Sequence, residues 1–147
     1  MGSSQTQLGG VSMSLVKNFI KTVQERYKTA DPFKIAEILN IDVRYCYLGR
    51  MPLGKTNYDD KGTIIILNNS LRDSPQKYFT LAHELGHYFM HEGLAGYYTG
   101  VRFGYDEFEN QANEFASGLL ALFYVEEYDR LPNTIRELEA TYGLPTN

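Results

Sequence analysis

The chain has 147 residues, of which 43% are hydrophobic and 22% are charged, and it contains one cysteine. These proportions are typical of a globular protein large enough to bury a core, and the lone cysteine excludes an internal disulfide framework and fits a reducing cytoplasm. A net charge of −4 argues against a nucleic-acid-binding surface, and the lack of a long apolar run predicts that no segment crosses a membrane.

Residues 1–10 (MGSSQTQLGG) are polar and rich in glycine and serine. We expect them to form a flexible leader or the remnant of a tag, followed by a single domain over residues 11–147. The first residues also lack a basic region followed by an apolar one, so the sequence predicts no secretory signal.

Two helices are predicted at the start of the domain. Apolar side chains recur at helical spacing from Leu15 onward, which indicates an amphipathic helix that ends near Tyr27. Asp31 is then followed by Pro32, a pair typical of a helix cap and the first helical position. A second, short helix is therefore expected to end at Leu39.

Two strands are expected next. Residues 41–48 alternate well enough between apolar and polar side chains to predict a strand. Residues 49–61 contain glycine, proline and paired aspartates, which favour a turn or hairpin region. Residues 63–67 form a continuous β-branched and apolar run, which is typical of a buried strand.

The next predicted helix begins near Ser74, ends near Gly93 and carries the pentad H-E-x-x-H at residues 83–87. Residues four apart share one face of a helix, so the imidazoles of His83 and His87 can reach one cation with Glu84 beside them. Neutral imidazole nitrogens suit Zn²⁺, which accepts a tetrahedral site with an open position. The pentad therefore predicts a zinc site in which Glu84 is the candidate general base.

After an irregular segment, a further helix is predicted to begin near Asp106, and its apolar side chains keep a 3.6-residue period as far as Leu120. Two short helices are expected to follow, at residues 125–129 and 134–141. Together these elements predict an α+β fold, in which a small mixed sheet packs against a helical core that carries the pentad helix.

A catalytic zinc site needs a third protein ligand, with water at the fourth position. Six residues after the pentad are candidates: His91, Glu92, Asp106, Glu107, Glu109 and Glu114. Glu109 is better placed than the others, because Asn113 lies one helical turn later and can accept a hydrogen bond from the distal N–H of a ligating histidine. Spacing alone does not separate this role from that of an ordinary charge on an amphipathic helix. Cys46, alone on a predicted strand, is a poor candidate and is expected instead to be a small buried hydrophobic side chain.

The segment FTLAHELGHYFMH at residues 79–91, followed by Glu109-x-x-Ala112-Asn113-x-Phe115-Ala116, resembles the ImmA/IrrE family of metallopeptidases. The similarity extends over roughly residues 63–122 and implies a minimal zincin-like arrangement. It also implies that His83, His87 and Glu109 bind zinc and that Glu84 is the catalytic base. Members of this family commonly cleave helix-turn-helix repressors, so the resemblance implies a zinc-dependent endopeptidase with such a substrate.

Two features depart from the family pattern. Ala121-Leu122-Phe123-Tyr124 stands where a proline usually follows the leucines, and Asn113 occupies a position that is often aspartate. An oxyanion formed during hydrolysis would need a further hydrogen-bond donor. Four tyrosines after the pentad are candidates: Tyr88, Tyr97, Tyr98 and Tyr105.

Two other functions remain alternatives. The chain could be a zinc-stabilised module that captures a regulatory protein without cutting it, but a purely structural site would be closed by a fourth protein ligand and would have no use for Glu84. Direct DNA binding is opposed by the net negative charge and by the lack of a stripe rich in lysine and arginine.

Overall fold

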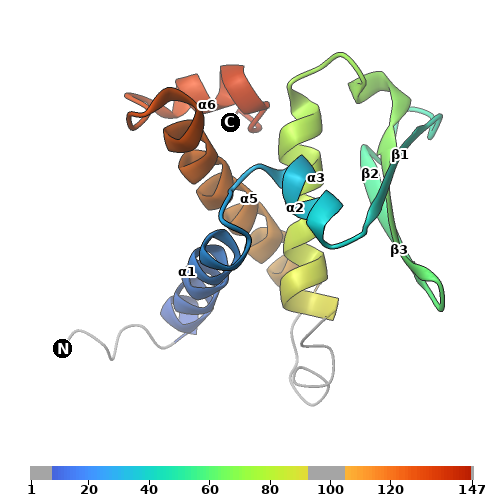
Figure 1. Ribbon diagram of the computed structural model, residues 1–147, viewed down its shortest axis with the longest axis horizontal. Coiled ribbons are helices and arrows are strands. Elements are labelled where there is room, and N and C mark those ends of the chain that lie inside the picture. The colour runs from blue at the N-terminus through green and yellow to red at the C-terminus, as the bar shows by residue number, and fades with distance from the viewer. Residues whose placement is uncertain (1–7, 93–104, 147) are drawn as a thin grey trace.

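The computed structural model of the protein describes residues 8–92 and 105–146, and Figure 1 shows the arrangement of its elements. In chain order they are α1 (Leu8–Tyr27), α2 (Pro32–Ile38), β1 (Asp42–Cys46), β2 (Gly54–Asp59), β3 (Gly62–Asn68), the 3-10 turn η2 (Asn69–Leu71), α3 (Gln76–Gly86), the π-helix η3 (His87–Glu92), α5 (Tyr105–Tyr128) and α6 (Ile135–Tyr142). The fold is α+β with a small sheet beside packed helices, which confirms the predicted fold class.

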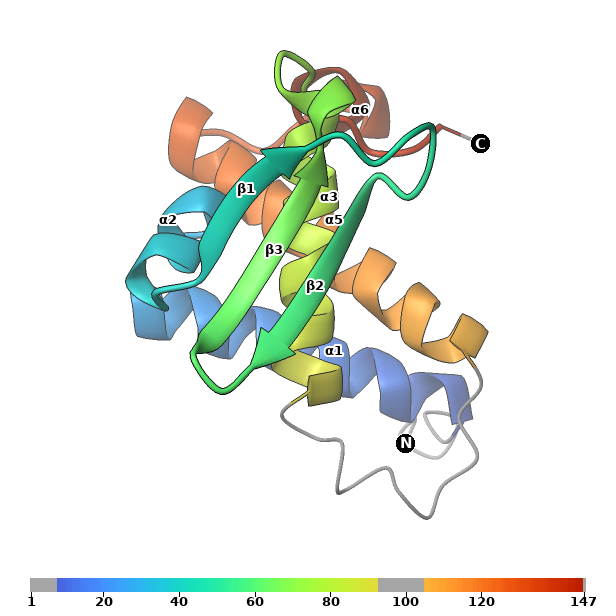
Figure 2. The same ribbon diagram turned by 90° about the vertical axis from the view of Figure 1, so that its right-hand side faces the viewer.

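The sheet has the strand order β1-β3-β2, with β1 parallel and β2 antiparallel to the central β3. It is therefore mixed, as predicted. Ile65 of β3 pairs with Val43 on one side and with Thr56 on the other. Ile65 and Leu67 are fully buried, which accounts for the apolar character of this strand. Figure 2 shows β2 at one edge of the sheet, with α3 behind the three strands.

β2 lies inside residues 49–61, where the sequence indicated only a turn or hairpin region. The hairpin is present, because β2 and β3 pair up to Asp59 and Gly62. The strand itself was not predicted, since its side chains are mostly exposed and it lacks the apolar alternation of a half-buried strand. A polar strand of this kind is common at a sheet edge.

α3 lies between the sheet and α5, as both views show (Figures 1 and 2). The two helices pack closely at Gly86, where an added Cβ would lie only 3.2 Å from the Cα of Ala112. Fully buried side chains from the sheet and from both helices fill the core beside this crossing; they include Ile65, Leu81, Leu85, Phe115 and Leu119. The crossing brings the pentad next to the first turns of α5.

The helix boundaries differ from the prediction in two places. α1 begins at Leu8 instead of near Leu15, although it ends at Tyr27 as expected. The helix predicted separately at residues 125–129 is not a separate element, since α5 continues to Tyr128. The chain from 121 to 124 contains neither proline nor glycine to end the helix.

Two helix starts are capped by a side chain, and the cap of α2 is the one that the sequence predicted. Asp31 accepts a hydrogen bond from the backbone N–H of Phe33 at the start of α2. Thr134 caps α6 in the same way, and Gly143 ends that helix with a left-handed φ of 73°. In the described part of the chain, no helix combines the length and the apolar character that a membrane crossing requires.

Candidate metal centre

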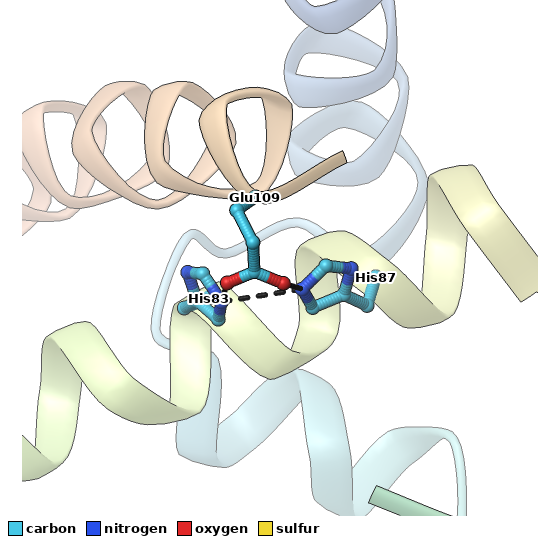
Figure 3. Close-up of side chains that lie close together, drawn as sticks. All are labelled: His83, His87 and Glu109. Atoms are coloured by element: carbon cyan, nitrogen blue, oxygen red, sulfur yellow. Dashed lines mark hydrogen bonds and ion pairs between the residues drawn. The ribbon is translucent and has the colours of Figure 1, made fainter. Parts of the chain in front are cut away.

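The pentad places two histidines on one face of the helix, opposite a glutamate from α5. His83 lies in α3, and His87 is the first residue of η3. The Nε2 atom of His83 is 3.0 Å from Oε1 of Glu109, and the Nε2 atom of His87 is 2.8 Å from Oε2 of the same carboxylate. Figure 3 shows the carboxylate of Glu109 pointing between the two rings.

The three side chains form a donor set that fits a divalent cation. One ligand atom from each of His83, His87 and Glu109 lies within 4.8 Å of the other two. Two imidazole nitrogens and a carboxylate oxygen match the donors found in catalytic zinc sites of the His/His/Glu type. No fourth histidine, cysteine, aspartate or glutamate joins this group among the side chains that the structure describes, at residues 16–91 and 106–146. The arrangement therefore leaves a coordination position free of these residues.

Asn113 orients the first of the two rings. Its Oδ1 lies 2.8 Å from Nδ1 of His83, at the distance of a hydrogen bond donated by the ring N–H. With the proton on Nδ1, the Nε2 atom of His83 carries the lone pair that a cation needs. This is the contact that the one-turn spacing of Glu109 and Asn113 predicted.

His91 contacts His87 but does not belong to the converging donor set. Its Nδ1 is 2.8 Å from Nδ1 of His87, and its Nε2 is 2.8 Å from Oε1 of Gln111. The His91 ring also stacks on Phe108, with 4.2 Å between the ring centroids. Sequence reasoning considered His91 only as a third ligand, and it did not consider Gln111.

Three of the remaining ligand candidates do not belong to the donor set. Asp106, Glu107 and Glu114 are exposed on α5 and do not belong to the converging group. The side chain of Glu92 is not among those that the structure describes. Cys46 is an exposed free thiol at the end of β1, so its alternative interpretation as a small buried side chain is wrong.

Glu84 points from α3 toward β2. Its Oε1 accepts a hydrogen bond of 2.6 Å from the hydroxyl of Thr56, which the sequence did not suggest because the two residues are 28 positions apart. Burial raises the pKa of Glu84 above its ordinary value of 4.5, and the hydrogen bond from Thr56 opposes this rise. A carboxylate with a raised pKa is well suited to accept a proton near neutral pH.

Glu84, His83, His87 and Glu109 all line one cavity of about 720 Å³ between β2 and α3. The cavity wall on the side of the sheet includes Thr56 of β2. The size is in the range of pockets that hold small ligands or short peptide segments. The candidate base and the metal donors are therefore reached from the same space.

The candidate oxyanion donors are only partly within the structure. Tyr88 packs against the hydrophobic core and does not line the cavity. Tyr97 and Tyr98 lie outside the described residues, as does the side chain of Tyr105. Tyr58 on β2 does line the cavity, and it was not among the residues that the sequence suggested.

For the peptidase activity that the sequence resemblance implies, Thr56→Val should lower turnover by about 10-fold to 100-fold without changing metal affinity. The substitution removes a hydrogen bond to a charged group, which is worth about 1.5–3 kcal/mol, and it frees the Glu84 carboxylate to rotate. Steady-state kinetics and zinc titration measure the two quantities separately. Thr56→Ser keeps the hydroxyl and should stay close to wild type. Equal turnover by the valine and serine variants would show that the hydroxyl plays no part.

The electrostatics of the site favour a neutral ring at His87. Burial, with the neighbouring His83 as the second cause, lowers the pKa of His87 from its ordinary value of 6.5 to about 4. Burial also lowers the pKa of His91. A neutral imidazole is the form that binds a metal, so protons compete weakly for His87 near neutral pH.

The metal-free protein is therefore expected to lose stability as the pH falls from 6.5 to about 4. In this window the unfolded chain binds a proton at His87 and the folded chain does not, so the free energy of unfolding decreases. The loss due to His87 should reach about 2 kcal/mol between pH 7 and pH 5. Urea unfolding in the presence of a chelator measures it. His87→Gln should show a weaker pH dependence, and an equally steep one would contradict the assignment.

Comparison with known proteins gives three matches. The model of a peptidase family described as the IrrE N-terminal-like domain matches residues 36–143, which is more than half of the chain. Uncharacterized immunity region protein 2 of Bacillus phage phi105 is 29% identical over 135 residues, covering 90% of this chain and 85% of that protein. Metallopeptidase ImmA of Bacillus subtilis (strain 168) is 27% identical over 147 residues, covering 89% of this chain and 79% of that protein.

Proposed function

This chain belongs to the ImmA/IrrE family of metallopeptidases, and from that premise we propose that it is a zinc-dependent endopeptidase that cleaves a helix-turn-helix repressor. The observation that carries the proposal is the shared cavity. A candidate base and a His/His/Glu donor set line the same space of about 720 Å³. A metal site that only stabilised the fold would need neither a general base nor a cavity through which a substrate reaches the metal.

The residues have distinct proposed roles. His83, His87 and Glu109 hold the zinc ion, and their donor types fit it. When bound, zinc lowers the pKa of water toward about 7 and polarises a carbonyl group. Glu84 accepts the proton of the attacking water at its carboxylate and later returns it to the departing amine. Thr56 holds that carboxylate toward the cavity through its hydroxyl.

β2 lies at an edge of the sheet in the described part of the chain, and this position supports an extended peptide as the substrate. Asn68 at the end of β3 donates its backbone N–H to the carbonyl of Leu53, the residue before β2. Because hydrogen-bonded pairs alternate along an antiparallel ladder, the odd-numbered residues of β2 direct their backbone groups toward β3. The backbone groups of Gly54, Thr56 and Tyr58 therefore point to the other side. These three residues line the cavity. An extended segment can pair with this edge and pass in front of Glu84.

A repressor substrate is supported by the family and by the context of one relative. The phage protein that this chain resembles is named for an immunity region, which is a setting in which repressors act. A repressor that binds DNA acts inside the cell, so the proposal implies a cytoplasmic enzyme. The fit of the lone cysteine to a reducing cytoplasm supports the same location.

The test is incubation of the zinc-loaded protein with a helix-turn-helix repressor encoded beside its gene. We expect two fragments whose masses sum to that of the repressor plus one water, measured by intact-protein mass spectrometry. Glu84→Gln serves as the matched control and should leave the repressor whole. A repressor that binds the wild-type protein and survives would instead support the module that captures its partner without cutting it.

A further inference from the structure

His87 makes a second polar contact on the side of its ring away from Glu109. Its Nδ1 is 2.8 Å from Nδ1 of His91, and the other nitrogen of His91 is 2.8 Å from Oε1 of Gln111. The three side chains therefore form a continuous chain of hydrogen bonds that ends at a buried amide, since Gln111 is only 3% exposed. This hydrogen-bond chain starts at Nδ1 of His87, the ring nitrogen that does not face Glu109.

Only one assignment of protons lets His87 bind a cation through Nε2. Two nitrogens 2.8 Å apart share one proton, so one Nδ1 donates and the other accepts. A metal bound at Nε2 of His87 needs the lone pair there, which places the proton of this ring on Nδ1. His91 must then accept with its own Nδ1 and must carry its proton on Nε2.

The Gln111 end of the hydrogen-bond chain also requires the proton of His91 to lie on Nε2. The atom of Gln111 that faces His91 is the carbonyl oxygen, which accepts the proton that His91 carries on Nε2. Stacking on Phe108 holds the ring of His91 in this orientation. Both ends of the chain are thus consistent with a single direction, from His87 through His91 to Gln111.

We infer that His91 is a positioning residue that, with Gln111 behind it, fixes the tautomer and the orientation of His87 for metal binding, and that it is not itself a ligand. The inference rests on the proposed function, because it takes His87 to be a metal ligand. With this role for His91, a side chain of α5 orients the ring of each pentad histidine. Asn113 holds His83 directly, whereas Gln111 holds His87 through an intervening ring.

The spacing of His91 follows from the widened helix. His87 and His91 belong to the six-residue π-helix η3, and their ring centroids are 4.9 Å apart. A π-helix is rare and occurs frequently at functional sites. Here it continues the pentad helix and places a third histidine against the second one. By sequence His91 is a candidate ligand, because it lies four positions after His87. In the structure its Nδ1 instead faces Nδ1 of His87.

The test compares zinc affinities by competition with a chromophoric chelator. His91→Phe keeps the ring that stacks on Phe108 and removes both nitrogens, so we expect affinity to fall about 10-fold to 100-fold. His91→Asn places an amide oxygen where Nδ1 stood and should recover most of this loss. Gln111→Met should weaken binding in the same direction as His91→Phe, and Gln111→Glu, which keeps an acceptor, should not. Asn110→Ala, an exposed change on the same helix, is the control.

A second measurement does not depend on affinity. In the zinc-loaded protein, ¹⁵N-detected NMR of the histidine rings should show His91 as the neutral tautomer with its proton on Nε2. A proton on Nδ1 of His91, or a His91 nitrogen bound to the metal, would overturn the inference. Wild-type affinity in both His91→Phe and Gln111→Met would also overturn it, while leaving the proposed function intact. Failure of the wild-type protein to bind zinc would overturn both.

Discussion

Glu84→Gln is expected to abolish peptide hydrolysis and to leave zinc affinity unchanged. Glutamine keeps the size of the side chain and an oxygen that can accept the hydrogen bond from Thr56, but it cannot take a proton from water. General base catalysis contributes about 10²–10⁴-fold, so turnover should fall by at least that order. Single-turnover cleavage of the repressor and chelator competition measure the two quantities on the same preparation.

The matched control is Glu114→Gln, which makes the same chemical change at an exposed position of α5. It should cleave and bind zinc as the wild type does. If Glu84→Gln cleaved the repressor at a rate near that of wild type, Glu84 would not be the base, and another group that lines the cavity would have to take the proton. If it lost zinc as well, the defect would lie in the fold of α3.

The predicted elements that proved most accurate are those with a strong apolar pattern. The apolar run at residues 63–67 became β3, whose Ile65 and Leu67 are fully buried. β2 was not predicted for the opposite reason, because an edge strand with exposed side chains lacks a clear apolar pattern in its sequence. Its position became apparent only from its pairing with β3.

The residues of the site also differ in how well the sequence could predict them. His83, Glu84 and His87 lie within a single pentad, so their common face could be predicted from helical spacing alone. Glu109 is 26 residues beyond His83. Its one-turn spacing to Asn113 and the resemblance to a family made it a candidate, but only the packing of α3 on α5 shows that the two residues meet. Thr56 and Gln111 have no local pattern that distinguishes them. Their contacts depend on strand register and on the width of η3, which only the folded chain reveals.

The close approach of α3 and α5 links the fold to the chemistry. At Gly86 the absence of a Cβ lets the two helix backbones come close, with the Cα of Ala112 only 3.2 Å from the position an added Cβ would take. Glu109 and Asn113 flank this contact on α5, and His83 and His87 flank it on the pentad helix and η3. The distances within the donor set therefore depend on how tightly the two helices pack.

Glu109→Gln is the substitution expected to remove the metal itself. Residues that only orient a ligand change metal affinity by about 10-fold to 100-fold, so the loss of an anionic ligand should exceed 100-fold. Glutamine occupies the same space and keeps one carbonyl oxygen, but it lacks the charge that offsets the cation. Hydrolysis should disappear with the metal and return in part when zinc is added in excess, which separates this variant from Glu84→Gln. Inductively coupled plasma mass spectrometry and chelator competition give the stoichiometry and the affinity.

Comparison with Glu114→Gln shows whether the loss is specific to the ligand, because both glutamates lie on α5 and lose the same charge. Retention of one tightly bound zinc by Glu109→Gln would mean that the third ligand lies elsewhere. His91 would then be the first residue to examine, since rotation of its ring away from both His87 and Gln111 would free its two nitrogens. Retention of zinc would contradict the ligand set, and a metal bound by His91 in place of Glu109 would also contradict the positioning role of His91.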